Sequence, residues 1–224
     1  MVSVSEIVDK LDERTREALG VRSHEKAIQL YGSRDSRYLK GISAKAKRFW
    51  VPVRWYDCPP PLHPDEPFVV DVETIPEEWA IVLPEDKWFD LDRIGQSGLS
   101  CTAEACMYIL KRLDAVEGKH VCIIGRGHAV QHLAEALLAC DATVTVCHSK
   151  TRDLLACTYP VDVIVNSAPG THPLSDVTKS RGGIVLDISG SLAEWKDSNL
   201  MTYIGAQEIG RLNTALLLNR FANL

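Results

Sequence analysis

The residues of this chain with the clearest chemical potential are the glycine turn Gly125-Arg126-Gly127 and a later polar cluster, Cys147-His148-Ser149-Lys150-Thr151. Glycines let the backbone turn sharply and come close to a ligand. A helix that begins directly after such a turn points its free N–H groups at a phosphate. Because Val130 stands where the usual dinucleotide fingerprint has its third glycine, the turn alone also fits a plain strand-to-helix connection.

The polar cluster favours one nucleotide over another. Proteins that prefer NAD place Asp or Glu after the second strand, about 20 residues on, to accept hydrogen bonds from the ribose. In this chain that place holds His148, Ser149 and Lys150 and no carboxylate. A hydroxyl and cations suit an extra phosphate, and Arg126 in the turn adds a further cation. The two positions together predict NADP as the cofactor.

The elements that must hold these residues alternate between strand and helix. His120–Ile124 is a short apolar run typical of a strand buried on both faces of a parallel sheet. Apolar residues from Val130 to Leu138 recur at helical spacing, and Ala142–Cys147 forms a second strand. Since the alternation continues from residue 119 to residue 204, we expect an α/β domain with a parallel sheet.

The first half of the chain predicts a second, smaller α/β domain. Its helix at 36–49 has Asp35 or Ser36 as the N-cap, and its first helix carries Ile7, Leu11 and Leu19 on one face. The predicted helices cover 3–19, 36–49, 102–113 and 211–221, and the predicted strands cover 26–31, 49–56 and 79–83.

Composition excludes several classes of function. The net charge of −5 and the pI near 5.8 give no electrostatic case for binding nucleic acid or an anionic membrane. No apolar stretch is long enough to span a bilayer, and the N-terminus has no apolar signal region. The seven cysteines form no paired spacing, which fits reduced thiols in a cytoplasmic protein without a metal site.

Several motifs resemble the bifunctional methylenetetrahydrofolate dehydrogenase/cyclohydrolase family. GKHVCIIGRG followed by CHSKT is similar to the family's G-K-x-x-x-V-I-G-R-S and C-H-S-x-T. Asp90-Leu91-Asp92, Ala80–Pro84 and Gly98–Ala103 resemble its K-D-V-D-G, V-Q-L-P and R-L-x-P-C-T-P motifs. The resemblance covers most of the chain in the same order.

The resemblance implies a fold and a domain division. It predicts a folate-binding catalytic domain at 1–113, completed by a C-terminal helix at 211–224, and a Rossmann NADP-binding domain at 114–205, with a cleft between them. It also implies a homodimer that forms through the nucleotide domain.

The resemblance implies an activity and the residues that carry it. The reaction is NADP-dependent oxidation of 5,10-methylenetetrahydrofolate to the methenyl form, with or without hydrolysis to 10-formyltetrahydrofolate. The family pattern S-x-x-Y-V-x-x-K-x-K assigns Tyr38 and a catalytic lysine, for which Lys45 is preferred over Lys40 and Lys47, while Ile42 stands four residues after the tyrosine. Asp92 takes the place of the substrate-binding aspartate.

Two departures from the family bear on the second reaction. Val82 replaces the glutamine that supports the lysine, and residues 206–213 replace a glycine-rich loop that lines the cleft. The departures leave two alternatives: a catalytically inactive relative with a structural or regulatory role, or a Rossmann dehydrogenase for another substrate.

Overall fold

The computed structural model describes residues 3–20, 26–62, 64–71, 90–93, 98–159, 161–170, 183–196 and 201–224. These residues form two compact units, one of 1–4 with 98–210 and the other of 5–97 with 211–224. The division lies between residues 97 and 98, rather than between the expected 113 and 114, because the helix α4 (Cys101–Arg112) packs against elements of the nucleotide-binding unit. The predicted strand at 79–83 lies outside the described residues.

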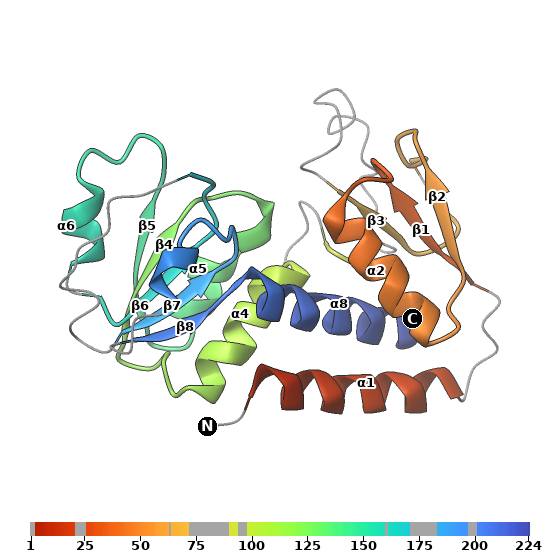
Figure 1. Cartoon of the computed structure of the whole chain (residues 1–224), viewed down its shortest axis with the longest axis horizontal. Coiled ribbons are helices and arrows are strands. Elements are labelled where there is room, and N and C mark those ends of the chain that lie inside the picture. Colours follow the sequence, from red (N-terminus) through yellow and green to blue (C-terminus); the bar gives the residue numbers. More distant parts are fainter. Residues whose placement is uncertain are drawn as a thin grey trace. The chain divides into compact units, whose positions relative to one another are not determined.

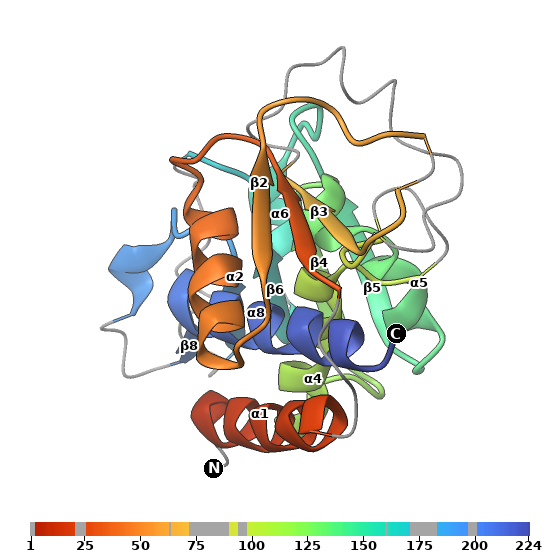
Figure 2. The same cartoon turned by 90° about the vertical axis from the view of Figure 1, so that its right-hand side faces the viewer.

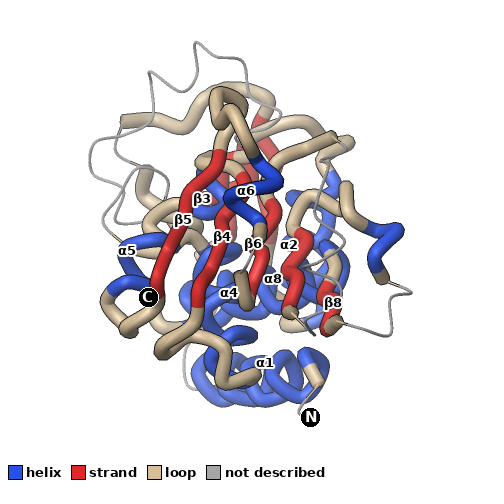
Figure 3. The backbone as a smooth tube through the Cα atoms, turned by 90° about the vertical axis from the view of Figure 1, so that its left-hand side faces the viewer, coloured by secondary structure: helices blue, strands red, loops and turns tan. Residues whose placement is uncertain are grey.

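The unit of 98–210 is built on a parallel sheet in the order β5-β4-β6-β7-β8 (Figures 1 and 3). The strands are β4 (His120–Ile124), β5 (Thr143–Cys147), β6 (Val163–Asn166), β7 (Ile184–Asp187) and β8 (Thr202–Ile204). The central strands β4, β6 and β7 are almost wholly buried, as their apolar, β-branched sequences require. The predicted α/β class and the strands at 120–124 and 142–147 are therefore confirmed.

The strand order contains a reversal. From β4 the chain moves outward to β5 and then returns to place β6 on the other side of β4. In open α/β sheets, a crevice for ligands forms beyond the carboxyl ends of the two strands at such a switch point. In this unit those strands are β4 and β6.

The helix after the glycine turn differs from the expectation. A short 3-10 helix (His128–Val130) follows the turn, and α5 (Leu133–Leu138) begins only after it. His132 adopts a left-handed backbone with φ of 59°, which breaks the helical path between the two pieces. The prediction of one helix opening directly after the turn is therefore wrong.

The other unit contains a three-stranded parallel sheet in the order β2-β1-β3 (Figure 2). Its strands are β1 (Ile28–Tyr31), β2 (Val53–Tyr56) and β3 (Phe68–Val70), and its helices are α1 (Val4–Gly20), α2 (Arg37–Arg48) and the C-terminal part of α8 (Ala206–Ala222). Ser36 is the N-cap of α2, since its hydroxyl accepts a hydrogen bond of 3.1 Å from the Leu39 N–H. The predicted amphipathic face of α1 is buried at Ile7, Leu11 and Leu19.

The helix α8 begins earlier than the sequence predicts. Residues 206–213, expected to replace a loop, form its first two turns. Ala206, Gln207 and Glu208 favour helix, and Gly210 alone does not stop it. The interpretation of 206–213 as a rebuilt loop is therefore wrong. None of the helices in the described part of the chain is long and apolar enough to cross a membrane.

Candidate functional site

The glycine turn closes against the next strand of the sheet. Gly125 has φ of 109°, and a Cβ atom there would lie 2.2 Å from the Ser167 Oγ and 3.3 Å from the Ala168 nitrogen. The Ser167 N–H donates to the Ile124 carbonyl oxygen at 2.8 Å, which fixes this approach. Only glycine combines this backbone angle with this closeness, so the turns after β4 and β6 abut at the switch point.

Gly127 meets a different requirement. Among the described residues other than its two chain neighbours, none has an atom within 4 Å of the place its Cβ would take, and its backbone is extended. Arg126 and Gly127 are both exposed. The turn therefore combines a tight base at Gly125 with open backbone at Gly127, as a phosphate-binding turn requires.

The polar cluster after β5 lies at the same edge of the sheet. The Gly125 N–H donates to the Cys147 carbonyl oxygen at 2.8 Å, which joins the ends of β4 and β5. The next residues form a tight turn, in which the His148 N–H donates to the Thr151 Oγ1 at 2.9 Å and the Lys150 N–H donates to the His148 Nδ1 at 3.1 Å. This bond makes the His148 ring part of the turn, while the Ser149 and Lys150 side chains are exposed.

Tyr38 and Asp92 come together in the other unit. The Tyr38 hydroxyl donates to the Asp92 Oδ2 at 2.7 Å, and Asp92 is only 4% exposed. The Asp92 N–H donates to the Asp90 Oδ1 at 3.0 Å, and the Arg220 guanidinium donates to the Leu91 carbonyl oxygen at 2.8 Å. The two predicted substrate-side residues therefore form one hydrogen-bonded pair on a braced segment.

Lys45 contacts different partners. Its Nζ lies 2.5 Å from the Asp12 Oδ1 of α1, with both side chains almost fully buried, and 5.9 Å from the centre of the Phe49 ring. Burial lowers the pKa of Lys45 below its ordinary value of 10.5 despite the opposing effect of Asp12. The structure thus pairs the preferred lysine with α1, and its described contacts do not include Tyr38.

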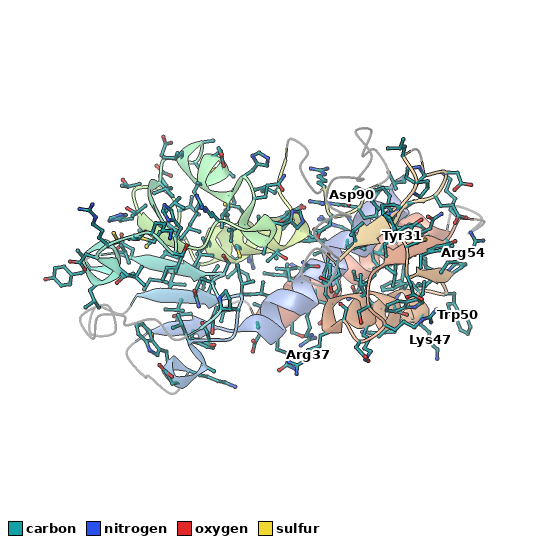
Figure 4. All side chains as sticks on the ribbon, turned by 90° about the horizontal axis from the view of Figure 1, so that it is seen from above. Tyr31, Arg37, Lys47, Trp50, Arg54 and Asp90 are labelled. Atoms are coloured by element: carbon teal, nitrogen blue, oxygen red, sulfur yellow. The ribbon has the colours of Figure 1, made fainter. Side chains whose placement is uncertain are left out.

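The competing lysines also have other surroundings. Lys40 is exposed and lies 3.2 Å from the Asp35 carboxylate. Lys47 lies beside Trp50 at the outer edge of its unit, apart from Asp90 (Figure 4). Ile42, four residues after Tyr38, is fully buried. Val82, predicted to replace the supporting glutamine, is outside the described residues.

The structure also shows residues that the sequence analysis missed. Asn166 and Asp187 end β6 and β7, face each other in register, and are fully buried. The signal was present in the sequence as a polar residue closing each of the apolar strands VIVN and IVLD. Buried polar groups of this kind are almost always hydrogen-bonded in native proteins.

The open parallel sheet, with a glycine turn at its switch point, defines a dinucleotide-binding protein of the Rossmann type. A model of the tetrahydrofolate dehydrogenase/cyclohydrolase NAD(P)-binding domain matches residues 100–214, about half of the chain. This chain therefore belongs to the tetrahydrofolate dehydrogenase/cyclohydrolase family, which confirms the resemblance.

Known relatives agree with this assignment. The bifunctional protein FolD of Acidovorax sp. (strain JS42) is 39% identical over 99 residues, which are 42% of this chain and 35% of that protein. FolD of Thermosipho africanus (strain TCF52B) is 36% identical over 130 residues, 53% of this chain and 48% of the relative. The chain thus spans between about a third and a half of the length of these curated relatives.

Solved structures extend the likeness of fold to both units. The N5,N10-methylenetetrahydrofolate dehydrogenase-cyclohydrolase (FolD) of Trypanosoma brucei, solved with NADP and an inhibitor, superposes with a TM-score of 0.77 at 18% identity. The superposition covers 99% of this chain and 96% of the other. At this identity the likeness shows the fold alone.

Proposed function

We propose that this chain oxidises 5,10-methylenetetrahydrofolate to 5,10-methenyltetrahydrofolate with NADP as the hydride acceptor. The observation that carries the proposal is the family's NAD(P)-binding domain with a tight Gly125 and an open Gly127 at its switch point. The activity follows from membership of the family and from a nucleotide site whose backbone remains open to a ligand.

The residues at the carboxyl edge of the sheet fit NADP. The open backbone at Arg126 and Gly127 would hold the pyrophosphate, and the exposed Arg126, Ser149 and Lys150 side chains would hold the extra phosphate. No carboxylate stands between Cys147 and Arg152 to repel that phosphate or to bind a ribose hydroxyl in its place. When bound, NADP supplies the nicotinamide carbon that accepts the hydride.

The Tyr38–Asp92 pair is proposed to bind the folate. A half-buried phenol offers a flat apolar face to a pterin ring, and the buried Asp92 carboxylate accepts hydrogen bonds from its nitrogens. The hydrogen bond between the two residues holds both groups ready for the ligand.

The second reaction of the family, hydrolysis of the methenyl ring, is expected to be weaker in this chain. Opening the methenyl ring requires a water molecule and a group that manages its protons. Lys45 is paired with Asp12, and Ile42 occupies the place four residues after Tyr38. We therefore expect hydrolysis to 10-formyltetrahydrofolate to be weaker than hydride transfer.

The test is an absorbance assay of coenzyme reduction with 5,10-methylenetetrahydrofolate, run with NADP and with NAD. The proposal predicts turnover with both components present and a higher kcat/KM for NADP. Tight NADP binding without turnover would instead identify an inactive relative. Reduction of NADP with a different substrate, and none with the folate, would identify another dehydrogenase.

We also propose that the protein is a cytoplasmic homodimer. None of the seven cysteines, all of which lie in the described part of the chain, forms a disulfide. Burial raises the pKa of the Cys106 thiol to about 12, so this thiol stays protonated and unreactive. Such thiols suit a reducing compartment.

The dimer rests on analogy with the family, and light scattering that finds a monomer at micromolar concentration would contradict it.

A further inference from the structure

Two buried polar residues join the turns beyond β6 and β7. Asn166 and Asp187 are the last residues of these strands, and both are fully buried. The Asn166 Nδ2 donates to the Asp187 Oδ1 at 3.1 Å. A carboxylate without solvent needs several donors to offset its desolvation, so the remaining partners of Asp187 identify what it holds in place.

Both oxygens of Asp187 accept further hydrogen bonds. Oδ1 accepts from the Gly190 N–H at 3.0 Å and from the Ser189 hydroxyl at 3.1 Å. Oδ2 accepts from the Leu192 N–H and from the Tyr203 hydroxyl, each at 2.8 Å. Burial raises the pKa of Tyr203, and Asp187 raises it further, so the phenol remains a donor. Asp187 therefore fixes the turn after β7 and joins it to β8.

Asn166 extends the same network to the turn after β6. Its Oδ1 accepts from the Ala168 N–H at 3.3 Å, while its Nδ2 lies 2.9 Å from the hydroxyl oxygens of Ser189 and Ser191. The Ser191 hydroxyl in turn reaches the Ala168 carbonyl oxygen at 3.3 Å. The turns at 167–170 and 188–191 are thus held as one piece, with Pro169, Gly170 and Ser189 exposed above the buried pair.

The strand order indicates which half of a dinucleotide lies over these turns. In a Rossmann unit, the ribose of the adenosine half binds after the second strand, and the pyrophosphate binds at the turn after the first. In this chain those positions follow β5 and β4. The remaining half, the nicotinamide nucleotide, must then extend to the other side of β4, over the ends of β6 and β7.

We infer that Asp187, acting through Asn166 and the turns at 167–170 and 188–191, is a positioning residue for the nicotinamide half of the coenzyme. The inference rests on the proposed function, because it assigns a role within the same coenzyme site. Asp187 touches backbone and side chains of the turns, so its effect on the coenzyme is indirect. Replacement by Asn would set an amide donor against the Gly190 or Leu192 N–H and release one turn.

The test separates the two halves of the coenzyme by calorimetric titration. NADP probes both halves, and 2′,5′-ADP probes only the adenosine half with its extra phosphate. Asp187→Asn should weaken NADP binding by roughly tenfold or more and leave 2′,5′-ADP binding within about twofold of wild type. Lys150→Ala, the matched control on the adenosine side, should weaken both ligands. The kcat of Asp187→Asn should also fall, because the nicotinamide ring is no longer held in position to accept the hydride.

A second variant covers the case in which Asp187→Asn does not fold. Ser191→Ala leaves the carboxylate and its backbone donors in place. It removes the contacts of the Ser191 hydroxyl with the Asn166 amide, the Ser189 hydroxyl and the Ala168 carbonyl oxygen. It should weaken NADP a few-fold and spare 2′,5′-ADP. Wild-type NADP affinity in both variants, or an equal loss of both ligands, would overturn the inference. Failure of the wild-type protein to bind NADP would instead overturn the proposed function, and the inference with it.

Discussion

At the scale of single residues, spacing indicated which side chains share a face of an element, but not which residues of other elements they contact. Tyr38 and Asp92 were assigned separately from sequence, and the structure brings them to hydrogen-bonding distance. Lys45 lies seven residues after Tyr38, close to two helical turns, so spacing placed it on the same face. The ion-pair partner of Lys45 is the buried Asp12 of α1. That contact joins residues far apart in the sequence, and no periodicity along α2 could reveal it.

Breaking the buried Lys45–Asp12 pair is expected to destabilise the fold. Lys45→Met leaves the Asp12 carboxylate buried without its partner, and should lower the free energy of unfolding by about 3–5 kcal/mol in urea denaturation. The double variant Lys45→Met with Asp12→Leu removes both charges and should regain most of that loss. Lys40→Met is the control, because its ion pair is exposed and should contribute under about 0.5 kcal/mol.

The same double variant tests the role of Lys45 in the reaction. We expect it to retain the dehydrogenase rate of the wild type, since Lys45 is bound to α1. A stable double variant that has lost the rate would show that Lys45 takes part in the reaction, as the family pattern implies.

The pH dependence of stability follows from the lowered pKa of Lys45. Between that pKa and 10.5, the unfolded chain keeps the proton that the folded chain has lost. Because the unfolded state then binds more protons, the contribution of Lys45 to the free energy of unfolding rises with pH in this window. Comparing urea denaturation of the wild type and the double variant across alkaline pH should show this difference. If the free energies of unfolding of the two proteins changed in parallel with pH, the predicted contribution of Lys45 would be contradicted.

The coenzyme preference is testable at one exposed residue. Ser149→Asp places a carboxylate where the extra phosphate of NADP is expected, and should weaken NADP binding by about 1.5–3 kcal/mol while NAD binding holds or improves. Thr143→Asp adds the same charge at the opposite end of β5 and serves as the control. Titration calorimetry gives both affinities, and unchanged NADP affinity in Ser149→Asp would refute the assignment.

At the scale of elements, strands were easier to predict than helix ends. The apolar run of β4 predicts its strand because few other structures bury so short a segment on both faces, and β5 pairs with it at the edge of the sheet. The start of α5 and the start of α8 were predicted wrongly. His132 adopts a left-handed backbone that its residue type does not require, and α8 continues through Gly210. The early start of α8 agrees with the helix propensity of residues 206–208, whereas local propensity does not predict the left-handed backbone of His132.

The continuous α8 helix gives a prediction about stability. Gly210 lies in the helix, and in the described part of the chain no atom beyond its neighbours and the adjacent helix backbone lies within 4 Å of an added Cβ. Gly210→Ala should therefore stabilise the protein by about 0.5–1 kcal/mol. The melting temperature should rise by roughly 2 °C in calorimetry. Gly125→Ala is the opposing control, since its Cβ would meet Ser167 and its φ is 109°. A lower melting temperature for Gly210→Ala would argue for a loop at this position.

At the scale of the whole molecule, the order of elements was predictable from the sequence, and the boundary between the two units was less predictable. The motifs follow the family's order, and residues 211–224 belong to the same unit as residues 5–97. The helix α4 belongs to the nucleotide-binding unit because it packs against α5 and the turn at 128–130. The sequence alone does not reveal these contacts. Asn166 and Asp187 were missed for the same reason, because strand register alone makes them neighbours.

The central claim is that a hydride moves from the methylene bridge of the folate to NADP. The direct measurement uses 5,10-methylenetetrahydrofolate carrying deuterium in that bridge, with mass spectrometry of the reduced coenzyme. The account predicts that the NADPH formed by the wild-type protein gains the mass of one deuterium. Reduced coenzyme without the label, or labelled folate left unchanged by a protein that binds NADP, would contradict it.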